Sequence, residues 1–80
     1  MANMPTIAVV TGGASGIGYA LVERFLADDT YDLVACLDIA ENVEDLFDDP
    51  AVRAHRCDVT DHDRVEAVVE ALEEEGRIDA

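Results

Sequence analysis

A glycine-rich segment directly behind an apolar run constrains the fold of this chain more than any other feature. Residues 11–18 read Thr-Gly-Gly-Ala-Ser-Gly-Ile-Gly, with the apolar residues 7–10 before them and a helical pattern after them. Glycines at positions 12, 16 and 18 let the backbone turn sharply out of a strand and approach a ligand without a Cβ in the way. The N-terminus of the helix that follows offers free N–H groups and partial positive charge. We therefore expect a strand, an anion-binding loop and a helix, in that order.

The rest of the chain alternates between strand-like and helix-like patterns. Strands are predicted over residues 6–11, 33–38 and 52–57, and residues 77–80 read as the beginning of a fourth strand. Helices are predicted over residues 16–27 and 41–48, and a last helix, capped by Thr60 or Asp61, is expected to end at Gly76. Such alternation implies right-handed βαβ crossovers and a parallel sheet. We expect half of a doubly wound α/β fold with strand order 3-2-1, in which strand one is exposed on one side.

The glycine spacing is more specific than the general dinucleotide fingerprint Gly-x-Gly-x-x-Gly. It follows Thr-Gly-x-x-x-Gly-Ile-Gly and so resembles the short-chain dehydrogenase/reductase family, with Thr11, Gly12, Gly16, Ile17 and Gly18 at the fixed positions. The alternative is an ordinary glycine-rich turn, which the flanking strand and helix patterns disfavour. The resemblance covers essentially the whole chain. It implies one partial NAD(P)-binding Rossmann domain over residues 1–80, a fragment cut at the start of strand four.

Asp38 ends the second predicted strand, about twenty residues after the last motif glycine, where a dinucleotide-binding fold places its ribose acid. A carboxylate there would accept the ribose hydroxyls and repel a 2′-phosphate. The basic residue with which the family usually compensates that charge is missing, since Ser15 precedes Gly16 and Ile39 follows Asp38. We therefore expect NAD to be preferred over NADP. Without the glycine loop before it, Asp38 would read as a solvated residue at a strand end.

The pair Asp58 and Val59 follows the third predicted strand, where many family members have an Asp-Val pair against the adenine ring. A carboxylate suits the exocyclic amine of adenine, and the Val59 backbone can serve the ring nitrogens. The competing interpretation is an ordinary capping sequence, because Asp-x-Thr-Asp often precedes a helix. The cofactor-binding residues that the resemblance implies are Gly12, Ser15, Gly16, Ile17, Gly18, Asp38, Ile39, Asp58 and Val59.

Hydride transfer in this family depends on a serine, a tyrosine and a lysine, the last two as Tyr-x-x-x-Lys. The sequence contains no lysine, and its only serine is Ser15 in the glycine loop. Glu23 stands four residues after Tyr19, and Ala35 stands four residues after Tyr31. We therefore expect no catalytic residue and no turnover in this chain alone, while the intact family member would interconvert an alcohol and a carbonyl.

Two function classes remain open. The first is the NAD-binding segment of a short-chain oxidoreductase that acts on a small-molecule alcohol or carbonyl. The second is a noncatalytic dinucleotide-binding or regulatory module that uses the same loop. The related nucleotide-sugar epimerases fit less well, because their loop is usually Gly-x-x-Gly-x-x-Gly and residue 15 is serine.

The charge, cysteine and histidine content of the chain limits the kinds of ligand and partner that it can bind. The formal net charge of −14 argues against nucleic-acid binding, which needs a basic footprint. Cys36 and Cys57 lack Cys-x-x-Cys spacing and fall in predicted buried strands, so we interpret them as core residues in a reducing compartment. His62 between Asp61 and Asp63 suits a capping segment better than a metal site, and we expect no bound metal.

The N-terminal residues and the open edge of the first strand bear on localisation and assembly. Residues 1–5 lack a basic region and a long apolar stretch, so we expect no signal peptide, no membrane span and a cytoplasmic protein. An open central strand invites association, either by self-pairing or by docking of a missing C-terminal half. We therefore expect a homo-oligomer.

Overall fold

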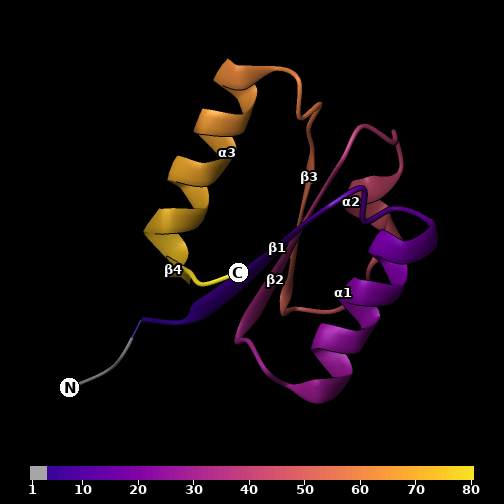
Figure 1. Ribbon diagram of the computed structural model, residues 1–80, viewed down its shortest axis with the longest axis vertical. Coiled ribbons are helices and arrows are strands. Elements are labelled where there is room, and N and C mark those ends of the chain that lie inside the picture. The colour runs from indigo at the N-terminus through magenta and orange to yellow at the C-terminus, as the bar shows by residue number, and fades with distance from the viewer. Residues whose placement is uncertain (1–3) are drawn as a thin grey trace.

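A four-stranded parallel sheet with helices on both faces forms the protein, as a computed structural model of residues 4–80 shows (Figure 1). The elements are β1 (Thr6–Thr11), α1 (Gly16–Asp28), β2 (Leu33–Asp38), α2 (Val43–Leu46), β3 (Val52–Arg56), α3 (His62–Glu75) and β4 (Arg77–Ile78). Residues 1–3, part of the stretch considered for a signal peptide, lie outside the described residues. The predicted alternation of strands and helices is confirmed.

The strands stand in the order β3-β2-β1-β4, and each pairing is parallel. The predicted order 3-2-1 is therefore confirmed, but the expectation of an open edge on β1 is wrong for the first part of that strand. β4 pairs with Thr6 and Ile7, and the Val9 amide donates to the Ala80 carbonyl at 2.9 Å. A few residues suffice to cover this edge, because α3 ends beside the start of β1.

Gly76 ends α3 as predicted, although its backbone is extended rather than left-handed, with φ of −179°. Glycine is needed here for space, because a Cβ would collide with the carbonyl oxygen of Pro5. The next amide, that of Arg77, donates to the same oxygen at 2.7 Å. At the other end of α3 the carboxylate of Asp61 accepts from the Arg64 amide at 3.2 Å. Of the two candidate caps, Asp61 is therefore the one that binds.

α2 is shorter than predicted and covers only Val43–Leu46. Phe47 has already left the helix in an extended conformation, and its ring stacks on that of Tyr19 in α1 with centroids 5.3 Å apart. α2 therefore ends before the predicted residue 48, at the point where the chain turns the Phe47 ring onto α1. Propensity along the chain carries no information on such a contact.

The core consists of two clusters, one on each face of the sheet. Side chains of β1, β2 and the residue after β3 pack against α3 on one face, and side chains of β1 and β2 pack against α1 and α2 on the other. Figure 1 shows α3 on one side of the sheet and α1 and α2 on the other. The fully buried large side chains are Ile7 and Leu72 in the first cluster, and Val22, Val34 and Val43 in the second. Coverage of both faces explains why β2 is apolar without alternation. Cys36 and Cys57 are buried and free, and they lie in different clusters.

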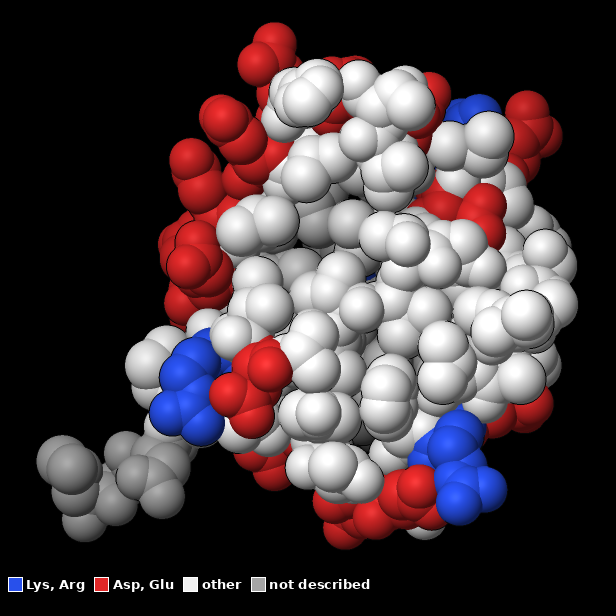
Figure 2. Space-filling model, viewed as in Figure 1, with Lys and Arg blue, Asp and Glu red and all other residues white. Residues whose placement is uncertain are grey.

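The apolar side chains that recur at four-residue spacing along α1 are only partly buried. Val22 is buried and Phe25 and Leu26 pack beside it, but Ile17 is 83% exposed and Leu21 is 42% exposed. Helical periodicity marks which residues share a face, but the length of sheet beneath that face decides how many of them are covered. Figure 2 shows how charge is distributed over one face of the molecule. Acidic side chains gather along the left margin, over α3, and the centre of the view is largely uncharged.

Two leucines test this account of the core. Replacing Leu72 with alanine removes a fully buried side chain, and we expect the free energy of unfolding to fall by about 2–5 kcal/mol. Leu21→Ala is the matched control, and it should cost less than about 1 kcal/mol because the side chain is already 42% exposed in the folded protein. Urea unfolding followed by circular dichroism measures both, and equal losses would contradict the assignment of the core.

Candidate dinucleotide-binding site

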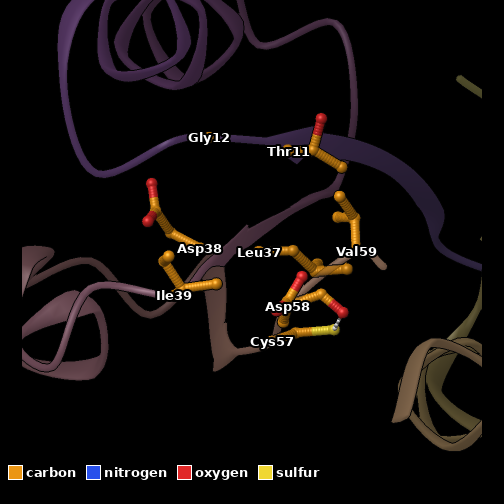
Figure 3. A pocket seen from close by; sticks show the side chains of 8 residues that line it. All are labelled: Thr11, Gly12, Leu37, Asp38, Ile39, Cys57, Asp58 and Val59. Atoms are coloured by element: carbon orange, nitrogen blue, oxygen red, sulfur yellow. Dashed lines mark hydrogen bonds between the residues drawn. The ribbon is translucent and has the colours of Figure 1, made fainter. Parts of the chain in front are cut away.

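A cleft of about 380 Å³ opens at the carboxyl ends of β1, β2 and β3. Its lining residues are Thr11, Gly12, Leu37, Asp38, Ile39, Cys57, Asp58 and Val59 (Figure 3). The volume is in the range of small-molecule sites, roughly 300–1,000 Å³. In open α/β sheets, ligands bind outside the carboxyl ends of the strands, which is where this cleft lies.

The glycine loop leaves open space beside the cleft. Gly12 and Gly16 have φ of 68° and 60°, a backbone conformation that residues with a Cβ rarely adopt. A Cβ built on either would meet no atom of the described chain within 4 Å. The requirement at these two positions is therefore conformational, and the space above them is free for a ligand.

Gly18 and Gly13 serve close packing instead. A Cβ on Gly18 would collide with the Gly12 carbonyl, so only glycine lets the first turn of α1 approach the loop this closely. A Cβ on Gly13 would collide with the sulfur of Cys36. Sequence reasoning missed Gly13, although the doubled glycine was a visible signal. Burial raises the pKa of the Cys36 thiol to about 11, so the group beneath the loop stays neutral near pH 7.

The first turn of α1 contributes no negative side chain of its own. Ser15 is its N-cap residue, and within residues 4–80 its hydroxyl makes no capping bond and the first turn carries no acidic residue. By contrast, the first turn of α2 carries Glu44 and Asp45, and that of α3 carries Asp63. In a chain with a net charge of −14, α1 therefore keeps amide donors and dipole charge available to an outside anion.

Asp38 points from the end of β2 toward the segment that follows Gly12 (Figure 3). Its Oδ2 accepts a hydrogen bond from the Ala14 amide at 2.9 Å, and its Oδ1 accepts one from the Ala40 amide at 3.0 Å. These bonds, first that from Ala14 and then that from Ala40, hold the pKa of Asp38 below its ordinary value of 3.8. The group is therefore an ionised acceptor at neutral pH, in contact with the glycine loop.

The other predicted site residues fall into two places. Ile39, Asp58 and Val59 lie in the cleft with Gly12 and Asp38. The others, Ser15, Gly16, Ile17 and Gly18, form the loop and the first turn of α1 beside it. The structure also adds Leu37 and Cys57 to the lining, together with Thr11, a motif position that was not among the predicted site residues.

Part of the capping interpretation of residues 58–61 is also correct. The Oδ1 of Asp58 accepts from the amide and the hydroxyl of Thr60, at 2.9 and 2.7 Å. These bonds lower the pKa of Asp58 and hold the turn that leads into α3. Residues 58–61 thus form the turn and also place the Asp58 carboxylate at the cleft.

Within residues 4–80, no group of three or more His, Cys, Asp or Glu side chains is arranged to hold a metal ion. None of the helices described there is long and apolar enough to cross a membrane.

Comparison with known proteins bears on the family. The family model described as short chain dehydrogenase matches residues 6–80. The chain belongs to the short-chain dehydrogenase family. This confirms the resemblance stated on the glycine motif. The parallel sheet with alternating helices agrees with the Rossmann-type fold expected for it.

Several family relatives are oxidoreductases. The chain is 39% identical over 75 residues to galactitol 2-dehydrogenase of Agrobacterium fabrum, an alignment that covers 91% of this chain and 29% of that protein. It is 41% identical over 66 residues to NAD-dependent glycerol dehydrogenase of Listeria innocua, with coverage of 79% and 25%.

Two solved structures agree with the fold. A 4-hydroxyisoleucine dehydrogenase complexed with NADH superposes with a TM-score of 0.69 at 25% identity, over 88% of this chain and 29% of that one. A short chain dehydrogenase of Leptospira borgpetersenii with bound NAD⁺ has a TM-score of 0.71 at 25% identity, with coverage of 90% and 27%. The chain thus spans less than a third of the length of these short-chain dehydrogenases.

Gly18 tests the packing of the loop on α1. Gly18→Ala should lower the free energy of unfolding by about 1–3 kcal/mol, because the added methyl meets a backbone carbonyl that cannot move aside. Ala20→Ser, at an exposed position of the same helix, is the control and should stay within about 0.5 kcal/mol of wild type. Urea unfolding measures both, and an unaffected Gly18→Ala variant would contradict the observed contact.

Acid unfolding tests the bonds to Asp38. Because its pKa is lower in the folded state, its stabilisation is fully present above about pH 4 and is lost as the pH falls through the folded value. Below about pH 4, wild-type stability should therefore fall more steeply than that of Asp38→Asn, which has no carboxyl group to protonate. Urea unfolding over a pH series measures this difference, with Glu41→Gln as the exposed control. Parallel curves for wild type and Asp38→Asn would refute the assignment.

Proposed function

We propose that this chain binds NAD through its adenosine diphosphate half, in the cleft at the carboxyl ends of β1, β2 and β3. The whole protein would then be an NAD-dependent oxidoreductase that interconverts a small-molecule alcohol and a carbonyl. The observation that carries the proposal is the acid-free N-terminus of α1, which adjoins open space above Gly12 and Gly16. NAD would supply the hydride acceptor, and the residues of this chain would bind and orient it.

The pyrophosphate would bind to backbone amides rather than to basic side chains. Gly16, Ile17 and Gly18 open α1, and the amides of a first helical turn have no acceptor inside the helix. The Ser15 hydroxyl makes no capping bond within the described chain and could donate as well. Screening over about 8 Å at physiological salt lets this local donor set act despite the acidic surface.

The ribose and the choice of cofactor would depend on Asp38. Its oxygens each keep acceptor capacity for a ribose hydroxyl, whereas a 2′-phosphate would face an ionised carboxylate. Positions 15 and 39, where a basic residue would compensate, hold Ser15 and Ile39. The NADH and NAD⁺ in the two similar structures support the preference for NAD over NADP.

The adenine ring would lie between apolar side chains at the outer part of the cleft. Ile39 and Val59 are 61% and 53% exposed, although both are large and apolar, and both line the cleft. A flat ring placed there would remove this surface from water, at about 25 cal/mol for each Å². The Asp58 carboxylate, ionised at neutral pH, could accept a hydrogen bond from the exocyclic amine.

The catalytic part of the reaction is assigned to the whole protein and not to these 80 residues. The sequence contains no lysine, so it holds no Tyr-x-x-x-Lys pair, and we expect no turnover from this chain alone. A noncatalytic module is not favoured, because the similar proteins are oxidoreductases. The homo-oligomeric state and the cytoplasmic location stay predictions.

Calorimetric titration of the chain with NAD and NADP tests the proposal. We expect saturable NAD binding and NADP binding that is weaker by about tenfold or more, because a charge repulsion of 1.4 kcal/mol already gives that factor. In Asp38→Ala the ratio of the two affinities should fall toward one. Glu70→Gln, on the exposed face of α3, removes one charge far from the cleft and should keep the wild-type ratio. A folded chain that binds neither dinucleotide would contradict the proposal.

A further inference from the structure

One carboxylate joins two segments of the cleft wall. Asp38 accepts the Ala14 amide from the glycine loop and the Ala40 amide from the segment after β2. The two bonds use different oxygens, so both form at the same time. Ala14 is half-buried, and a buried amide without an acceptor is costly. Within the described chain, the acceptor of this amide is Asp38.

The loop has few other anchors. At its start the Gly12 amide donates to the Leu37 carbonyl at 2.8 Å, which continues the pairing of β1 with β2. At its end the Tyr19 amide donates to the Ser15 carbonyl at 3.4 Å, which belongs to the first turn of α1. Between these points Asp38 accepts the Ala14 amide, and Gly13 packs on the sulfur of Cys36, so these two side chains of β2 hold the middle of the loop to the sheet.

We propose that Asp38 is a positioning residue for the glycine loop. By accepting the Ala14 amide, it keeps Gly12 and Gly16 in their open conformation before any cofactor binds. The inference rests on the proposed function, in which this loop receives the pyrophosphate. It adds a role to Asp38 beyond reading the ribose. Preorganisation of this kind raises affinity, because the loop need not be ordered during binding.

The surroundings of Asp38 favour this role. Arg56 is its partner in the β2–β3 register, but the Arg56 Nε donates to the Ile39 carbonyl at 3.1 Å, and no ion pair to Asp38 is found within residues 4–80. Asp58 shares the cleft and is itself bonded to Thr60. Cys36, two residues before Asp38, is neutral at pH 7. Backbone amides are thus the partners that Asp38 has, and their bonds account for its low pKa.

The role has a consequence for cofactor choice. If Asp38 only repelled a 2′-phosphate, its removal would raise the affinity for NADP. If it also positions the loop, its removal disorders the pyrophosphate site, which NAD and NADP share. Exchanging the cofactor preference through position 38 alone would then lower both affinities.

Amide hydrogen exchange of the cofactor-free chain, followed by NMR, tests the positioning directly. In Asp38→Ala the Ala14 amide should exchange faster by about tenfold or more, since it loses its acceptor. The Val34 amide, which donates to the Ala51 carbonyl within the sheet, should keep its wild-type rate and so report an intact fold. Glu41→Ala removes a neighbouring exposed charge as the control. An unchanged Ala14 rate in Asp38→Ala would overturn the proposal.

The conservative variant Asp38→Asn distinguishes loss of a single hydrogen bond from general destabilisation of the fold. The side chain of Asp38→Asn can accept only one of the two amides, because its NH₂ group is a donor. We expect faster exchange at Ala14 or at Ala40 but not at both. Slow exchange at both amides in this variant would count against the positioning role.

Binding of inorganic pyrophosphate, which has no ribose, gives a second readout with a definite sign. Coulomb's law alone predicts tighter anion binding when the negative charge of Asp38 is removed. Loss of loop positioning predicts weaker binding by about tenfold, with Glu41→Ala giving the purely electrostatic effect. Tighter binding by Asp38→Ala would overturn the positioning role. A wild-type chain that shows the exchange effect but binds no dinucleotide would instead refute the proposed function.

Discussion

Between the end of β1 and the start of α1 the backbone must leave the sheet, reverse its direction and enter a helix within residues 12–15. Left-handed backbone at Gly12 and Gly16 makes this turn, and the close approach of Gly18 to the Gly12 carbonyl fixes the direction in which α1 leaves it. That direction lays Val22 against the sheet and brings the first amides of α1 beside the cleft. Fold and candidate site thus depend on the same turn, because one backbone path serves both.

The acidic side chains and the free amide donors of this strongly acidic chain occupy different places around the cleft. Acidic side chains gather over α3 (Figure 2). The first turn of α1, by contrast, carries no acidic residue. The two cleft carboxylates, Asp38 and Asp58, stand at strand ends and are held by amides or a hydroxyl. Hydrogen-bond donors therefore lie at the N-terminus of α1, where the proposed function places the phosphates. Acceptors lie at the strand ends, where it places the ribose hydroxyls and the adenine amine.

Much of the fold could be predicted because its signals are local. The apolar run of β2, the stripe of Val68 and Leu72 on α3 and the glycine spacing each lie within one segment of sequence. The errors come from contacts between segments. α2 ends early because Phe47 stacks on Tyr19, and β1 is partly covered because β4 begins directly beyond Gly76. Ile17 and Leu21 share the apolar spacing of α1 but stay exposed, since periodicity does not reveal how far the covered surface extends.

The sequence by itself determined the order of the elements, the glycine loop and the identity of the residues at its strand ends, because backbone freedom, apolar periodicity and charge are properties of single residues and their near neighbours. Tertiary structure decided which of those residues meet. It brought Asp38 to Ala14, across 24 positions of sequence, and Gly13 to Cys36. Parallel pairing of β1 with β2 sets these distances, and a register between distant segments is a property of the packed sheet rather than of either strand.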